Sequence, residues 1–234
     1  MRNVKAAMSS DSMLDLGSYH LAALAQSEGT KALASAFRPV QDELQTATTA
    51  RVEAEKAMTD LRVAVRFSEN ALERAIRQVA LLAHGADNNA SGGPAFKALF
   101  PNGLDAELRP VGQSQVASAV ALRERLNTQP AAAKVKAQVM DDFDKALAVF
   151  RLAIDARQAG DTKVSEARAS ESGARERFVS AYDSNIGAIR QLFPRDRAQQ
   201  DLHFDEISSG HASAGGGGGD TPTPPTPAND TKSM

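Results

Sequence analysis

The one histidine with ligand-like neighbours in the sequence is His203, in the segment DLHFDEI. Asp201 and Asp205 would share a face with His203 in extended backbone, and Glu206 lies three residues further on. Imidazole and carboxylate groups together can bind a divalent ion. The same spacing is common in the charged end of a domain, where the apolar residues between the charges dock on a core. These apolar residues are Leu202, Phe204 and Ile207. We favour docking and predict neither a metal site nor a cofactor.

Sequence motifs of known catalytic sites are absent from the chain. There is no Gly-x-Ser-x-Gly turn, no Gly-x-x-x-x-Gly-Lys phosphate loop and no His-Glu-x-x-His zinc motif. The absence of Cys excludes thiol catalysis, thiolate metal sites and disulfides. No Glu-x-x-His motif occurs, which argues against a di-iron centre inside a helical bundle. We therefore predict that the protein is not an enzyme and has no small-molecule substrate.

Two arginine-rich stretches could contact phosphate groups: RERL at 123–126 and ARERF at 174–178. Each has a Glu between its arginines, as expected for ion pairing within one solvated helix. The chain carries 27 Lys and Arg against 29 Asp and Glu, a net charge of −2, so the molecule as a whole does not attract a polyanion. A nucleic-acid-associated or phage-like accessory protein that uses these helix faces is the alternative function.

Two Leu-Phe-Pro elements are the strongest candidates for a binding surface. FKALFPNGL at 96–104 puts four large apolar residues and a proline in a loop, and QLFPRD at 191–196 repeats the Leu-Phe-Pro pattern. They could form a docking patch for another protein. Alternatively, each could close the open end of a helical core, with the proline ending a helix. The candidate patch consists of Phe96, Leu99, Phe100, Leu104, Leu192 and Phe193.

Helical periodicity dominates the regions that must position these elements. Apolar residues recur every three or four positions over 14–84 and again over 131–193, so each region has a stripe that needs a partner surface. The stripe residues that we expect to hold the core together are Leu72, Ile76, Val79, Phe178, Tyr182 and Ile189. A shorter helix is predicted over 113–126, with Val116, Val120 and Leu122 on its buried side, and one helical turn over 95–99. These patterns predict an all-α protein.

The two helical regions also resemble each other in sequence. AIRQ occurs at 75–78 and again at 188–191, 113 residues later. At the same offset, Phe37-Arg38 matches Phe150-Arg151 and Glu53-Ala54 matches Glu166-Ala167. We interpret the matches as a duplicated helical hairpin. The second hairpin would turn at AGDT, 159–162, and the first at TATT, 46–49. Two such hairpins predict an antiparallel four-helix bundle with a shorter connecting helix.

Pro39 allows a second interpretation of the first copy. A proline inside a helix removes a hydrogen bond and breaks or kinks the helix, yet it fits well in a first turn. The alternative is a break at Pro39 followed by one long helix to Ala83. We favour the hairpin because the apolar stripe continues in register through Pro39. The middles of both regions have few large apolar residues, so we expect the bundle to be thinly packed or exposed at that end.

The last 27 residues are rich in Gly, Pro and Thr and cannot bury enough apolar surface to order themselves. No apolar run is long enough for a secretory signal or a membrane helix, which predicts a cytoplasmic protein. The expected organisation is a flexible N-terminus at 1–13, a first hairpin at 14–84, a loop at 85–112, a connecting helix and second hairpin at 113–207, and a disordered tail at 208–234. The composition and fold favour a non-catalytic helical scaffold or interaction module that binds another protein or its own copies.

Overall fold

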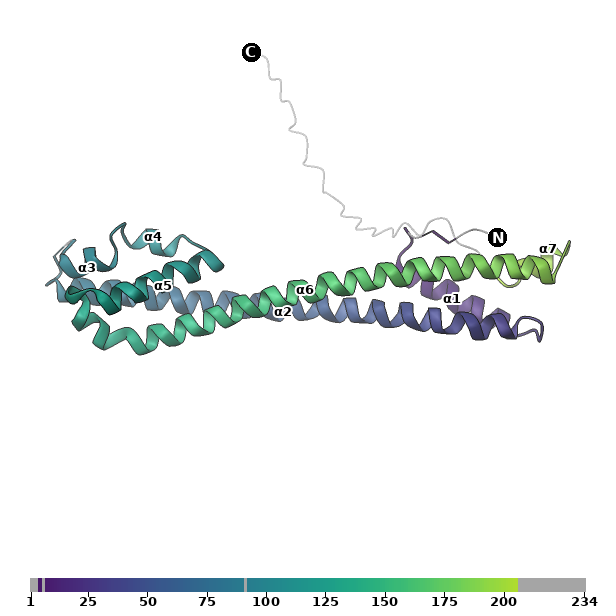
Figure 1. Ribbon diagram of the computed structural model, residues 1–234, viewed down its shortest axis with the longest axis horizontal. Helices are drawn as coiled ribbons and strands as arrows, with labels where there is room; N and C mark the ends of the chain where they lie inside the picture. The colour runs from purple at the N-terminus through teal and green to yellow at the C-terminus, as the bar shows by residue number, and fades with distance from the viewer. Residues whose placement is uncertain (1–3, 6, 91, 206–234) are drawn as a thin grey trace, which may run out of the picture.

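The computed structural model describes residues 4, 5, 7–90 and 92–205, and the chain is helical, without strands, within these ranges. Two long helices lie side by side and antiparallel and form a rod (Figure 1). They are α2, Lys31–Ala86, and α6, Ala133–Leu192. At about 1.5 Å per residue they are about 84 and 90 Å long. The expected tail, 208–234, lies outside the described residues.

Helix α1, Ser10–Leu24, packs at one end of the rod, where α2 begins and α6 ends (Figure 1). The side chain of Ser9 accepts a hydrogen bond from the Ser12 amide at 3.2 Å and caps the helix, so α1 begins inside the segment that we expected to be flexible. A short turn leads from α1 to α2. In this turn the buried Thr30 hydroxyl donates to the Leu24 carbonyl at 2.7 Å. Helix α7, Arg197–Asp201, follows α6 at the same end.

Three short helices and a 3-10 turn cover the opposite end, where α2 ends and α6 begins (Figure 1). They are α3, Pro94–Leu99, α4, Leu104–Leu108, α5, Gln113–Thr128, and η1, Pro130–Ala132. The Asp87 carboxylate, just beyond α2, accepts from the amides of Ala95 and Phe96 at 2.9 Å and caps α3. The helix predicted over 113–126 is confirmed as α5, but Val120 is exposed and Gln115 and Ala119 face the core instead.

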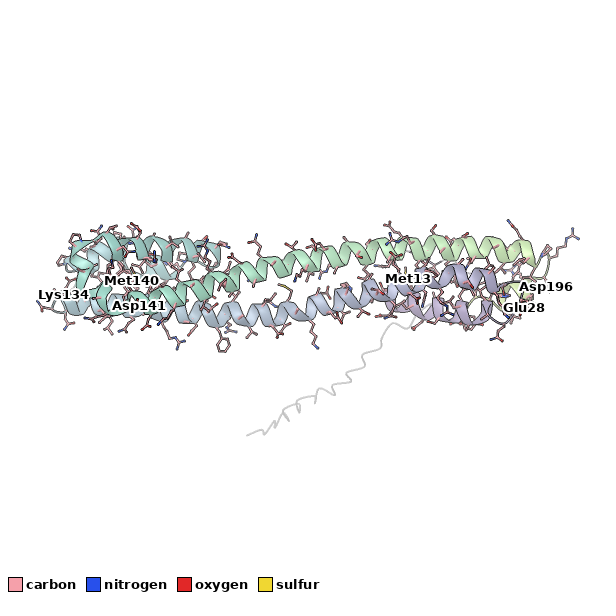
Figure 2. All side chains as sticks on the ribbon, turned by 60° about the horizontal axis from the view of Figure 1, so that its bottom comes forward. Met13, Glu28, Lys134, Met140, Asp141 and Asp196 are labelled. Atoms are coloured by element: carbon pink, nitrogen blue, oxygen red, sulfur yellow. The ribbon has the colours of Figure 1, made fainter. Side chains whose placement is uncertain are left out.

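The hydrophobic core is divided between the two ends. One cluster joins the C-terminal half of α2 to α3, α5 and the first half of α6, and the other joins α1 to the start of α2 and the end of α6. Figure 2 labels Met13 at the second cluster and Met140 beside the first. All six residues expected to hold the core together are buried. Leu72, Ile76 and Val79 lie in the first cluster, and Phe178, Tyr182 and Ile189 lie in the second.

The predicted hairpin turns are wrong, because both segments lie inside continuous helices. The hydroxyls of Thr46, Thr48 and Thr49 donate to the carbonyls four residues earlier, at 2.8–2.9 Å, which satisfies them within a helix. Gly160 does not end a helix; it lies where α6 approaches α2 so closely that a Cβ atom would be 2.5 Å from Leu61 Cδ1 and 2.6 Å from Met58 Sδ. The thinly packed region is therefore the middle of the rod.

Pro39 does not break α2 either. It lies on the exposed side of the helix, where water can hydrogen bond to the carbonyl that loses its partner. The buried neighbours Phe37, Gln41 and Leu44 hold both flanking turns against the second cluster. The single long helix of the alternative interpretation is present, but it begins at Lys31, before the proline.

The order of elements is similar in the two halves of the chain. In each half a short helix turns back into a long one, α1 into α2 and α5 into α6. Each half also contains a Leu-Phe-Pro sequence at a helix end, followed by a five-residue helix, α4 or α7. The hairpins of this structure thus have one short and one long arm, and they differ from the equal arms that we expected.

Two helical glycines provide a test of the packing at the α1 end. A Cβ atom on Gly17 would overlap Gln41 Oε1 and lie 2.8 Å from Phe178 Cε2, and both of these residues are buried. We expect Gly17→Ala to lower the free energy of unfolding by about 1–3 kcal/mol through overpacking. A Cβ atom on Gly187 would meet nothing within 4 Å outside its own stretch of helix. Gly187→Ala should therefore raise the free energy of unfolding by about 0.5–1 kcal/mol.

Urea denaturation followed by circular dichroism at constant pH measures both changes. Equal effects of the two substitutions would contradict the close approach of α1 to α2 and α6.

Candidate functional site

The two Leu-Phe-Pro elements end their helices in the same way. Phe100 and Phe193 directly follow the last residues of α3 and α6, with φ/ψ of −123°/66° and −121°/62°. In each element the phenylalanine amide donates to the carbonyl four residues back, at 2.8 and 3.0 Å. Each phenylalanine carbonyl then accepts from the amide three residues on, Gly103 or Asp196, at 3.0 and 3.3 Å. The proline therefore follows a helix end with an ordered turn in both places.

The six residues of the candidate docking patch differ in accessibility. Leu99 and Phe100 are buried in the core of the α5 end, and Phe96 and Leu104 are half-buried against it. At the other end, Leu192 is 47% exposed, whereas Phe193 is half-buried and stacks on His203 with ring centroids 5.5 Å apart. A partner could reach Leu192 without any rearrangement of the fold. It could not reach Leu99 or Phe100.

The arginines of the two candidate phosphate-binding stretches make contacts within the molecule. Arg123 Nε lies 2.6 Å from Asp144 of α6, and Arg125 pairs with the buried Glu107 of α4. The Arg123 guanidinium holds the pKa of Asp144 below its ordinary value.

In the second stretch, Arg177 donates to Glu43 of α2 at 2.7 and 3.0 Å, and Arg175 donates to the Met8 carbonyl. The intervening Glu residues suggested that these arginines pair within one helix. The structure instead shows contacts between different elements. Three of these arginines join one helix to another, and Arg175 joins α6 to the segment before α1.

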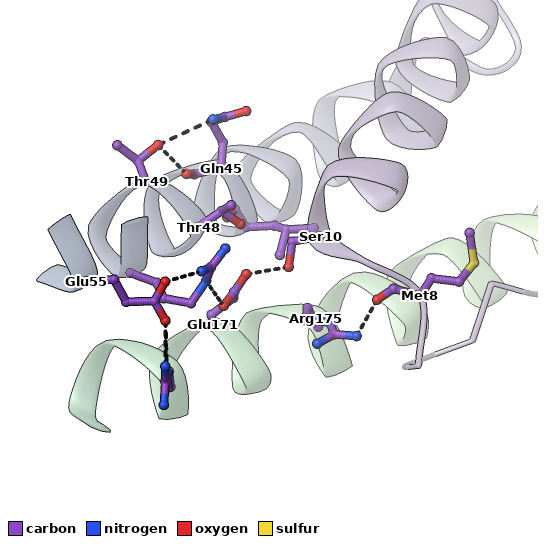
Figure 3. Close-up of polar contacts among 11 residues, drawn as sticks. Met8, Ser10, Gln45, Thr48, Thr49, Glu55, Glu171 and Arg175 are labelled. Atoms are coloured by element: carbon purple, nitrogen blue, oxygen red, sulfur yellow. Dashed lines mark hydrogen bonds and ion pairs between the residues drawn. The ribbon is translucent and has the colours of Figure 1, made fainter. Parts of the chain in front are cut away.

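A chain of polar contacts connects α1, α2 and α6 toward the middle of the rod (Figure 3). Glu171 of α6 is buried; it accepts from Ser10 Oγ at 2.6 Å, and its other oxygen lies 2.6 Å from Arg51 Nε of α2. Arg51 also donates to Glu55 at 2.8 Å, and Glu55 accepts from Arg168 at 2.8 and 3.0 Å. The hydrogen bond from Arg168 is the main cause that lowers the pKa of Glu55. The chain fixes which turns of α2 and α6 face each other.

The predicted docking of the apolar residues of DLHFDEI is confirmed for Phe204 and is wrong for Leu202. Phe204 is buried, and so is His203, whereas Leu202 is exposed and Ile207 lies outside the described residues. The ring of Phe204 stacks on His20 of α1, with centroids 4.9 Å apart. His203 Nδ1 lies 2.9 Å from the Gln199 carbonyl. Among the residues that the structure describes, no group of three or more His, Asp or Glu side chains could hold a metal ion; Glu206 lies outside them.

The buried His20 is the one residue of this region that the sequence did not single out. Its Nδ1 lies 2.8 Å from the His203 carbonyl, which only accepts, so Nδ1 carries the proton. Nε2, 3.0 Å from Asn185 Nδ2, then accepts from that amide. Both nitrogens are thus satisfied in the neutral ring, and burial lowers the pKa of His20 to about 4. In the sequence, a histidine among apolar residues of a predicted helix does not indicate that it takes part in such a hydrogen-bond network.

The chain matches no protein-family model, no curated protein and no solved structure. No helix in the described part of the chain combines the length and the apolar character needed to cross a membrane.

The neutral state of His20 makes stability depend on pH. An unfolded histidine, with a pKa near 6.5, takes up a proton before the folded one does as the pH falls. The stabilisation should be complete above pH 6.5 and decrease toward pH 4, by at most about 1.4 kcal/mol per pH unit. His20→Gln should reduce this slope relative to the wild type. Urea denaturation at several pH values measures it, and NMR titration of the ring reports the pKa directly.

A His20 ring that titrates near 6.5 in the folded protein would contradict the buried network. So would a variant whose free energy of unfolding keeps the wild-type dependence on pH between 4 and 6.5.

Proposed function

We propose that the protein is a non-catalytic helical scaffold, built from two copies of one unit, that holds two similar binding ends apart. The unit consists of a short helix, a long helix, a Leu-Phe-Pro turn and a five-residue helix. The observation that carries the proposal is the shared order of these elements in the two halves, with continuous long helices between the ends. The inserted segment 84–97, with the start of α3, separates the long helix from its Leu-Phe-Pro turn in the first copy only.

The sequence repeat supports a two-fold relation between the copies. In two antiparallel helices related by a two-fold axis, equivalent residues come together only near the axis. Glu55 and Arg168 are 113 residues apart, which is the offset of the repeat, and they form an ion pair at 2.8 Å. The pair lies near the middle of both long helices. The repeated residues Glu53-Ala54 and Glu166-Ala167 flank it.

Each half of the chain also contains one buried glutamate held by an arginine and a serine. Glu107 accepts from Arg125 and Ser118, and Glu171 accepts from Ser10 and pairs with Arg51. They are the two buried acidic side chains among the described residues. A buried charge with its partners favours a unique arrangement over loose packing, which suits a part that must keep two ends in fixed positions. This use of charge supports a structural role.

The nucleic-acid alternative draws little support from the two arginine-rich stretches, because their side chains contact other elements of the same molecule. A further group of arginines, Arg190, Arg195 and Arg197, lines a shallow hollow after the end of α6. Cations in this position also offset the partial negative charge at the C-terminus of a helix, which is an adequate reason for their presence. The scaffold remains the better-supported function.

Photo-cross-linking in cells of the native host tests the two binding ends. A benzoyl-phenylalanine residue would replace Val111 at one end, Leu202 at the other, and Asp161 in the middle, all three of which are exposed. Because the ends are proposed copies, we expect Val111 and Leu202 to give an adduct with the same polypeptide, identified by mass spectrometry. The Asp161 variant should not give that adduct.

No adduct at either end, or the same adduct from Asp161, would contradict the proposal. Different polypeptides at the two ends would contradict the equivalence of the copies.

A further inference from the structure

Several large apolar side chains remain exposed on the long helices. Leu81 and Leu192 lie near the ends of the rod. The others lie further inward and are Val52, Val63, Phe67, Val149 and Leu152. A third helix packs on α2 and α6 at each end, while between α1 and α5 the rod consists of the two long helices alone (Figure 1). The inward side chains therefore have no partner surface among the described residues.

Phe67 and Leu152 lie at the same level of the rod. Gly160 meets Leu61 on one side of this level, and on the other side Phe143 lines a shallow hollow together with Ala75. Both helices rise by the same distance per residue, and they run in opposite directions. Residue 67 of α2 therefore lies level with residue 152 of α6. Phe67 is 74% exposed and Leu152 is 69% exposed. The protruding ring of Phe67 and the apolar patch around Leu152 therefore occur at the same height along the rod.

The patch around Leu152 has the spacing of a hole that accepts a side chain from another helix. Val149, Leu152, Ala153 and Ala156 follow the i, i+3, i+4, i+7 pattern that forms such holes in packed helices. Val149 and Leu152 are largely exposed, and the two alanines leave room between them. A phenylalanine side chain is large enough to fill this space, and Phe67 is the most exposed of the large apolar residues described.

Charged residues lie beside both anchors. Arg66 precedes Phe67, Asp155 lies one turn after Leu152, and the exposed Arg151 precedes Leu152. Arg66 and Asp155 are exposed, and neither has an ion-pair partner among the described residues. When Phe67 of one copy meets Leu152 of another, Arg66 and Asp155 can pair at the edge of the contact. Since the ring, the hole and both charges belong to one chain, a second copy supplies all the complementary groups.

We infer that the middle of the rod is a self-association surface, in which Phe67 of each copy inserts into the hole formed by Val149, Leu152, Ala153 and Ala156 of a second copy. The inference rests on the proposed scaffold function, because it adds a way in which the scaffold assembles. In a two-fold arrangement the same contact forms twice, since Phe67 and Leu152 lie at one level. Burial of these four anchor side chains makes the middle of the rod a four-helix contact between copies.

Sedimentation equilibrium of the full chain over a range of concentrations tests the inference. The wild type should be dimeric at high concentration, and Phe67→Lys and Leu152→Glu should each weaken dimerisation by at least about tenfold, as loss of apolar anchors requires. Leu81→Lys and Leu81→Glu are matched controls at a comparably exposed position near the end of the rod, outside the surface, and they should dimerise like the wild type. Circular dichroism of each variant checks that the helices are retained.

A mixture of the Phe67→Lys and Leu152→Glu proteins provides the decisive result. A mixed dimer keeps one unaltered Phe67–Leu152 contact and gains a Lys–Glu pair at the other, so mixing should restore association. A monomeric wild type, equal loss in the control variants, or no restoration on mixing would overturn the inference. None of these results would change the adducts expected at the ends, so failure of this surface is distinguishable from failure of the scaffold proposal.

Discussion

The antiparallel contact between α2 and α6 is the constraint on which the rest of the structure depends. No residue of α2 between Thr48 and Val65 is buried, so the two core clusters are separated by a stretch with little apolar contact. The register of this stretch is set by other means. Gly160 allows a close approach to Met58 and Leu61, and the polar chain around Arg51 and Glu171 selects which turns meet.

The energies of these contacts indicate their role. An exposed ion pair such as Glu43–Arg177 is weakened by the surrounding water and contributes too little to hold a rod together. Glu171 is buried, and removing the partner of such a charge costs about 3–5 kcal/mol. Stability therefore comes mainly from the apolar clusters at the two ends. The polar chain makes any other register costly, which suits the scaffold function that we propose.

The sequence was sufficient to predict the helical class, the stripe residues of the core, the short helix before α6 and the helix ends at Leu-Phe-Pro. Each of these follows from periodicity or from a local signal. Gly160 and the threonines at 46–49 gave wrong predictions because the same residue types serve turns and long helices alike. Which role they take depends on a partner helix far away in the sequence. The turns that the structure does contain lie before Thr30 and at Pro130. Their sequences are no more distinctive than those of the wrongly predicted turns.

The candidate site was harder to predict for a related reason. Six residues were grouped by one motif, but burial separates Leu99 and Phe100 from Leu192. The apolar surface at Phe67 and Leu152 could not be recognised from periodicity, because exposure there results from the absence of a third helix. The pairing of Glu55 with Arg168 likewise becomes visible only when the antiparallel register is known.

The continuity of the long helices is the central claim, and a distance between two positions on α2 tests it most directly. The chain has no cysteine, so Ser35→Cys and Arg74→Cys, both at exposed positions, allow specific spin labelling. A continuous helix between them predicts a narrow distribution near about 58 Å in pulsed electron paramagnetic resonance. A turn at 46–49 would shorten the distance to about 20–30 Å, and that result would contradict the account.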